Sequence, residues 1–406
     1  MPSVPSVAEN NEWKKNLPVL WLGSFLCCAS FTMCVPFLPV FILKELHVAE
    51  SNVAFWSGVT FAVTFVIHCL LAPYWGALAD HVGQKKMVLR SGFGLGIVYI
   101  LTGLCQDITQ LVIVRILCGL ACGFVPACMT MASASLPESR MGWGMGLMQT
   151  SVASGAIMGP LIGGFLNSWF GMRASFYASG LSLFIATFFV IAVVRDNSIL
   201  VEGDCKLKHL LKDIGESLRN RELLYVMCMY CLVQSCVMMI QPLIALYVGE
   251  LMGAMDDNAI RMAGAIFSMA GITGILSATF WGKRGQTRGY IKTFCLVTAI
   301  AGSINLFQMF VGTIWQFVGI QFFFGLFLAG AVPNINAYIT KITPANTRGK
   351  AFGLLTSAMQ SGGVIGPLLG GALGTFLPTR FVLVIAGCIL LCVSLYSYVT
   401  KVHGTK

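Results

Sequence analysis

Charged residues are scarce in this 406-residue chain: Asp, Glu, Lys and Arg make up 10% of it, and hydrophobic residues make up 57%. A soluble protein carries about 25% charged residues, so the composition excludes an ordinary water-soluble fold. A membrane-spanning helix needs roughly 20 apolar residues. Twelve such segments can be placed, at 17–43, 53–79, 87–106, 108–133, 143–166, 172–194, 223–249, 259–281, 291–311, 314–339, 351–376 and 380–400. We therefore predict an all-α polytopic membrane protein with twelve transmembrane helices in a lipid bilayer.

The usual marks of enzymes and cofactor proteins are also missing. The five histidines are scattered, and no nucleophile stands in a recognisable setting with a base, so we expect no enzyme activity. No Gly-rich loop with a lysine is present to cradle a nucleotide phosphate, which argues against ATP as the energy source. Cys118 and Cys122 have helical spacing, but no second pair completes a metal site. We expect neither a metal nor a cofactor.

The basic residues predict the topology. The polar residues 1–16 include no apolar core ahead of a cleavage site, so we expect no cleaved signal peptide. With both termini on one side of the membrane, 21 of the 26 Lys and Arg lie on that side. Because basic loops mark the cytoplasmic side, we predict a multi-pass protein of the cytoplasmic (inner) membrane with both termini in the cytoplasm. The net charge of +10 then reflects topology, and no nucleic-acid partner is expected.

An internal repeat divides the chain into halves. Residues 154–164 recur at 361–371, a shift of 207, and seven of the eleven residues are identical. Pro36 and Pro242, and Gly76 and Gly282, match at a shift of 206. Both halves start on the same side of the membrane, which indicates a parallel duplication. We predict two pseudo-symmetric six-helix bundles, residues 1–195 and 223–406.

A polar linker is predicted between the bundles, at residues 196–222. Its leucines and isoleucine at 207, 210, 211, 214 and 218 recur at three- and four-residue steps. This period predicts an amphipathic helix on the membrane surface.

The loop after the second predicted helix carries a compact motif. Gly76 and Gly83 permit close approach and a tight turn, and Asp80 between them can pair with basic residues or with a helix N-terminus. Lys85 and Lys86 follow. This loop resembles the signature of the major facilitator superfamily, Gly-x-Leu-Ala-Asp-x-x-Gly-Arg/Lys-Lys, with Gln84 where a basic residue is common. The resemblance implies that these residues take part in gating.

The fourth predicted helix contains Arg115, followed by Gly119 and Gly123. A permanent cation within an apolar span is costly, so it is by default functional and faces the bundle interior. The alternative is an arginine that snorkels to the outer interface, because Asp107 starts the helix only two turns earlier. The element resembles the Arg-x-x-x-Gly of many superfamily members, which implies a role in proton coupling or in holding a substrate charge.

The fifth predicted helix carries the first copy of the repeat, with Gly155, Gly159, Pro160, Gly163 and Gly164. Pro160 removes a helix hydrogen bond, and the glycines allow tight helix contacts. The pattern resembles the motif of the exporter branch of the superfamily, notably the drug:proton antiporters. The resemblance covers essentially the whole chain and is greatest to twelve-helix bacterial multidrug-efflux transporters. It implies secondary active export of small molecules by alternating access, in exchange for protons, by a monomer.

The chain departs from that pattern in its charges. Gln286 and Gln321 stand in the second half where Asp80 and Arg115 stand in the first, so we expect coupling mainly in the first half. The sixteen Asp and Glu all fall in predicted loops or helix ends. The candidates for carrying the proton are Asp80, Glu45, Asp107 and His68, whose ordinary pKa suits a switch.

Uncharged polar and aromatic side chains could line a substrate cavity. The candidates are Phe31, His68, Gln149, Gln234, Gln241, Asn334, Asn336 and Gln360. Arg115 without a buried carboxylate favours neutral, zwitterionic or anionic substrates over cations. The alternatives are a dedicated exporter of an anionic metabolite, such as a carboxylate siderophore, and a nutrient importer or transporter-like sensor.

Overall fold

A computed structural model of the chain describes residues 12–137, 140–195, 220–343 and 348–403, and these fold into helices without a strand. The predicted surface helix at 207–218 lies outside these residues. The first half contains α1 (Glu12–Cys34), η1 (Val35–Phe37), α2 (Leu38–Lys44), α3 (Glu50–Val82), α4 (Gln84–Leu104), α5 (Ile108–Ala121), α6 (Phe124–Ser135), α7 (Met141–Phe170) and α8 (Met172–Val193). The second half contains α10 (Arg221–Met252), α11 (Asp257–Arg288), α12 (Tyr290–Leu306), η3 (Phe307–Phe310), α13 (Ile314–Leu328), α14 (Ala331–Ile342), α15 (Arg348–Phe376), α16 (Thr379–Tyr398) and η5 (Val399–His403).

The helices have the length and composition of membrane spans. Within the described residues, ten helical stretches are long and apolar enough to cross a bilayer. α7 and α15, with 30 and 29 residues, lie where the fifth and eleventh spans are predicted. Large apolar side chains also cover the outside of the molecule, for example Leu276 at 71% exposure and Trp315 at 71%. Such a surface fits lipid, which solvates apolar side chains, better than water.

Three of the predicted spans are interrupted. The first turns into the short helix η1, where Pro36 has no N–H to donate. The fourth, predicted as one helix over 108–133, is two helices that separate at Gly123, whose φ of +123° suits only glycine. The tenth, predicted over 314–339, separates into α13 and α14 at Ala329 and Gly330, both of which keep negative φ angles. The fourth and tenth spans are therefore each divided into two helices, although each is a continuous apolar run in the sequence.

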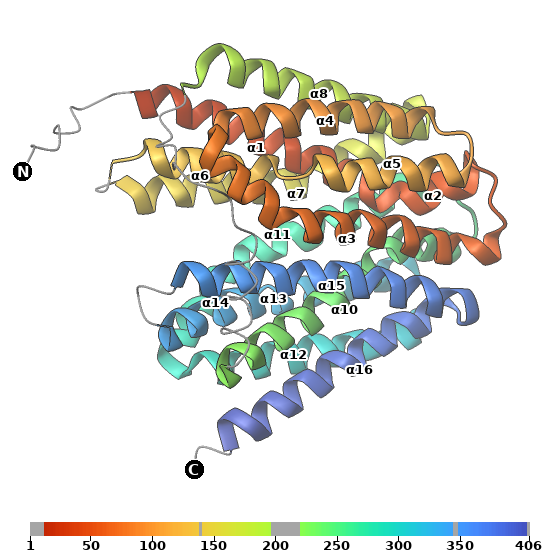
Figure 1. Ribbon diagram of the computed structural model, residues 1–406. Helices are drawn as coiled ribbons and strands as arrows, with labels where there is room; N and C mark the ends of the chain where they lie inside the picture. Colours follow the sequence, from red (N-terminus) through yellow and green to blue (C-terminus); the bar gives the residue numbers. More distant parts are fainter. Residues whose placement is uncertain (1–11, 138–139, 196–219, 344–347, 404–406) are drawn as a thin grey trace, which may run out of the picture.

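The two halves repeat the same packing (Figure 1). α1 packs on α7 and α4 on α8 in the first half, while α10 packs on α15 and α12 on α16 in the second. Between the halves, α3 packs on α15 and α11 packs on α7. The start of α1 and the end of α16 lie at one end of the molecule, and the ribbons of the two halves diverge toward that end (Figure 1). We call the opposite end the closed end.

Candidate functional site

The glycines of the first motif copy fit α7 against α1 of the same half. Gly155, Gly159 and Gly163 lie one turn apart on one face of α7. A Cβ added at Gly159 would be 2.6 Å from the Ala29 carbonyl oxygen, and one at Gly163 would be 2.4 Å from that of Met33. The two backbones are thus in contact, which only glycine permits.

The second motif copy makes the same contact within its own half. Gly362, Gly366 and Gly370 on α15 face α10. A Cβ at Gly366 would be 2.4 Å from the Ser235 carbonyl oxygen, and one at Gly370 would be 2.5 Å from that of Met239. The duplicated sequence therefore forms a duplicated helix contact.

A second face of each motif helix, next to the first, contacts a helix of the other half. On α11, a Cβ at Gly264 would lie 2.4 Å from the Pro160 carbonyl oxygen and 3.3 Å from Gly164 Cα. On α3, a Cβ at Gly58 would lie 2.3 Å from the carbonyl oxygen of Pro367. Gly58 and Gly264 are themselves related by the shift of 206. We call these two contacts the glycine crossings.

Polar contacts reinforce the closed end. Three side-chain hydrogen bonds join the halves there: Ser268 Oγ to Ile157 O at 2.6 Å, Arg261 Nε to Ser168 Oγ at 2.8 Å, and Lys44 Nζ to Met255 O. Each ends on a neutral oxygen of the opposite half. Such bonds can break one by one when the halves separate, because no buried ion pair has to be split.

The loop after α3 is built partly as predicted. Gly83 has a φ of +95° and makes the turn into α4. Lys85 Nζ donates to Val194 O at 2.6 Å and to Ile191 O at 3.1 Å, so its charge caps the end of α8. Lys86 is exposed.

Gly76 differs from the prediction of close approach. No atom lies within 4 Å of a Cβ added there, and the same is true of its counterpart Gly282. The side chain of Asp80 lies outside the described part of the structure, so its pairing stays a prediction.

Arg115 is buried on α5, with 3% of its surface exposed. This burial does not fit an arginine that snorkels to the interface. Among the residues that the structure describes, its Nε and Nη2 have no hydrogen-bond partner. The acidic residues that the structure describes lie in loops or in the end turns of helices. Arg115 is therefore a buried cation with N–H groups to offer to an anion.

The predicted cavity residues are spread over several helices. Phe31 on α1 meets Phe65 on α3 edge to face, with 6.5 Å between ring centroids. Gln149 is exposed, whereas Gln234, Gln241, Asn336 and Gln360 are half-buried. Asn334 is buried, and its amide donates to the Gly330 carbonyl at 2.7 Å, so it serves the break between α13 and α14. His68 is half-buried and lines a cavity of about 310 Å³ at the break between α5 and α6.

The profile of the family described as the Major Facilitator Superfamily matches residues 20–307 and 255–404. The chain belongs to the major facilitator superfamily. Multidrug resistance protein MdtG of Salmonella heidelberg (strain SL476) is 33% identical over 387 residues, which are 95% of this chain and 95% of that protein. The MdtG of Salmonella typhimurium (strain LT2) matches to the same extent.

Solved structures of the superfamily share the fold. A point mutant of the nucleoside transporter NupG aligns with a TM-score of 0.82 at 13% identity, covering 95% of this chain and 100% of that one. A bacterial homolog of the human lysosomal transporter Spinster aligns with a TM-score of 0.76 at 14% identity, covering 97% of each chain. Membership confirms the predicted family, and it makes the chain a multi-pass membrane transporter of small molecules.

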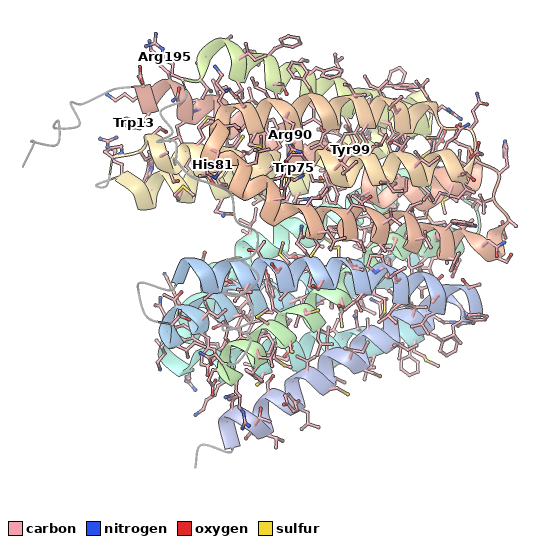
Figure 2. All side chains as sticks on the ribbon, in the orientation of Figure 1. Trp13, Trp75, His81, Arg90, Tyr99 and Arg195 are labelled. Carbon is pink, nitrogen blue, oxygen red and sulfur yellow. The ribbon has the colours of Figure 1, made fainter. Side chains whose placement is uncertain are left out.

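The sequence prediction missed Arg90, which lies in the interior of the first half of this transporter. The topology prediction assigns Arg90 to the 21 basic residues of the cytoplasmic side, although it lies inside the predicted span 87–106. Its guanidinium carbon is 3.7 Å from the centroid of the Trp75 ring, which reaches it from α3 (Figure 2). Both residues line the cavity that contains His68. The position inside an apolar segment was the available signal.

Proposed function

We propose that the chain is a secondary active exporter that moves small molecules, including drugs, out across the cytoplasmic membrane in exchange for protons. The observation that carries this proposal is the pair of glycine crossings. They close one end of the molecule through the motif that resembles the one in drug:proton antiporters. The 33% identity to MdtG, a protein named for multidrug resistance, supports the same function.

The proposal includes a topology. Twelve spans in two six-helix units, residues 1–195 and 223–406, would place both termini in the cytoplasm by the distribution of basic residues. The closed end is then the external side, and the divergence of the halves away from it (Figure 1) corresponds to an inward-facing state. Alternating access would proceed by rocking one unit against the other across the glycine crossings.

The substrate class follows from the interior charge. Arg115 is buried with unpartnered N–H groups, and within the described residues no carboxylate lies in the middle of a span. A substrate that brings a negative group would satisfy this cation, and a purely cationic one would be repelled. This same observation favours the second candidate, a dedicated exporter of one anionic metabolite.

Arg115→Gln should discriminate against anions. We expect the KM for an anionic dye, carboxyfluorescein, to rise about tenfold or more, which is the loss of about 1.4 kcal/mol of binding. Transport of ethidium, a cation, should instead improve, because its repulsion by Arg115 is removed. The measurement is dye uptake into everted vesicles, with Arg115→Lys as the control that keeps the charge. An equal loss for both dyes would assign Arg115 to folding or coupling instead of substrate charge.

The breadth of transport decides between the two candidates. Overexpression and deletion should be compared in one strain, with drug susceptibility and secreted compounds profiled together. Changes in susceptibility to several unrelated drugs support multidrug export. Loss of one secreted anion with unchanged susceptibility supports the dedicated exporter and rejects the multidrug proposal.

Geometry narrows the candidates for the proton-carrying group. Glu45 pairs with Arg173 at 2.8 Å, and Asp107 accepts the Gln110 N–H at 2.8 Å as the N-cap of α5. Both carboxylates therefore have structural partners. Asp80 and His68 remain, and we favour Asp80 because the signature motif contains it.

Proton exchange predicts that dye uptake into everted vesicles collapses when a protonophore is added. Asp80→Asn should lower turnover about a hundredfold or more, the scale of a lost proton-transfer group, while the melting temperature stays near that of the wild type. His68→Gln is the comparison variant. Uptake that persists with the protonophore would exclude proton antiport, and a normal rate in Asp80→Asn would remove Asp80 from the coupling.

A further inference from the structure

The break in the fourth span is held by two neighbouring residues of α4. A helix end leaves its last carbonyl groups without donors in the helix. Arg90 Nη1 donates to Leu120 O at 2.9 Å and Nη2 to Cys122 O at 2.8 Å. Ser91 Oγ donates to the Ala121 carbonyl between them at 2.6 Å. We call Arg90, Ser91 and the stacked Trp75 ring the α5 clamp.

The tenth span has a break at the corresponding place, but its carbonyl groups are held differently. There the indole Nε1 of Trp281 donates to Leu326 O at 2.9 Å. Trp281 follows Trp75 by 206 positions, and Leu326 follows Leu120 by the same shift. The position that corresponds to Arg90 is Leu296. One carbonyl position is thus bound by an indole in the second half and by a guanidinium in the first.

Because a guanidinium takes the place of the indole in the first half, two N–H groups there have no acceptor. Trp75 Nε1 and Arg90 Nε are both buried and have no hydrogen-bond partner in the described part of the chain. A buried donor without a partner is costly, so it points to an arrangement in which the donor is satisfied. The second half displays such an arrangement, since the Trp281 N–H is bound to its carbonyl.

We propose that Arg90 is a positioning residue of the transport cycle, and that Trp75 replaces it on the Leu120 carbonyl in the other main state. α5 carries Arg115, so the clamp sets where this cation sits relative to α3 and α4. α3 packs on α15 of the other half, and the proposal requires that α3 also shifts along α5 within its own half when the two halves rock, which carries Trp75 along α5. The proposal rests on the alternating-access cycle proposed above, and on neither the direction of transport nor the coupling ion.

Trp75→Phe is the decisive variant, because it keeps a smaller aromatic ring under Arg90 and removes the indole N–H, which has no acceptor among the described residues in this state. A purely structural Trp75 predicts an unchanged transport rate. The exchange predicts unchanged thermal stability with a maximal rate of carboxyfluorescein uptake lowered about fivefold, the scale of one hydrogen bond. The KM should stay within about twofold of the wild type. Trp315→Phe is the control, since it makes the same substitution at a tryptophan that is 71% exposed on the outside of the molecule, and it should transport as the wild type does. A wild-type maximal rate in Trp75→Phe would overturn the proposal.

A second readout does not depend on any substrate. The eight tryptophans can be replaced by fluorotryptophan and observed by fluorine NMR in lipid nanodiscs, with the Trp75 and Trp281 lines assigned from their Phe variants. Gly58→Val obstructs the closed end, whereas Gly319→Val leaves it intact. We expect the Trp75 line to differ between these two variants more than the Trp281 line does. If the Trp75 line has the same chemical shift in both variants, Trp75 does not replace Arg90 on the Leu120 carbonyl. This result would hold even if carboxyfluorescein proves not to be a substrate.

Discussion

Gly58→Val should hold the two halves apart at the closed end and stop transport. The added Cβ would lie 2.3 Å from the Pro367 carbonyl oxygen and 3.1 Å from Gly371 Cα. Both are backbone atoms, so no side chain can turn away to make room. Overpacking of this kind costs about 1–3 kcal/mol, which changes the ratio of two states by about 5- to 150-fold. Gly264→Val should act in the same way, because its Cβ would meet the Pro160 carbonyl oxygen.

Hydrogen–deuterium exchange in nanodiscs can measure this effect without labels. Exchange should rise at the start of α3 and α11 and fall at the opposite ends of these helices. Gly319→Val is the matched control, since no atom lies within 4 Å of a Cβ there. It should leave exchange and transport as in the wild type. Exchange that is unchanged in Gly58→Val, together with a normal transport rate, would mean that the halves do not separate at the crossings.

The sequence predicted which segments correspond but not which surfaces meet. Gly155, Gly159 and Gly163 share one helix face by their four-residue spacing, and this face could be read from the sequence. That it packs on α1, while Pro160 and Gly164 face α11, depends on how two separate units are placed in space. No local pattern contains that information.

The interior polar residues were harder to predict than the helices. Apolar segments are fixed by the bilayer, which admits few backbone structures. The break at Gly123 lies inside such a segment, because glycine is common in both continuous and broken membrane helices. Arg90 was counted with the basic loops for the same reason: its role comes from carbonyl groups that appear only once the fourth span is broken.

Gly76→Val should produce the opposite result, a protein that folds well and stays closed at the end where Gly58 lies. No atom lies within 4 Å of a Cβ at Gly76 or Gly282 in this state, so valine meets no obstacle. It should even stabilise α3 slightly, because glycine is about 0.5 kcal/mol worse than valine in a helix. Yet Gly76 follows Gly58 by 18 residues, about five helical turns, so both lie on one face of α3. In the other state, the halves would meet at the end opposite the closed end. This face of α3 would then approach the other half at Gly76.

Rocking between the two states therefore predicts opposite signs for stability and activity. Gly76→Val should melt at the same temperature as the wild type or slightly higher. Its dye uptake should fall at least about tenfold, which corresponds to raising the free energy of the obstructed state by about 1.4 kcal/mol. Hydrogen–deuterium exchange at the closed end should fall, since the protein seldom leaves the state in which this end is closed. Gly76→Ala should be intermediate because its side chain is smaller. If Gly76→Val transports normally, the two glycines are not alternate contacts of one face, and closure at the opposite end must use other residues of α3.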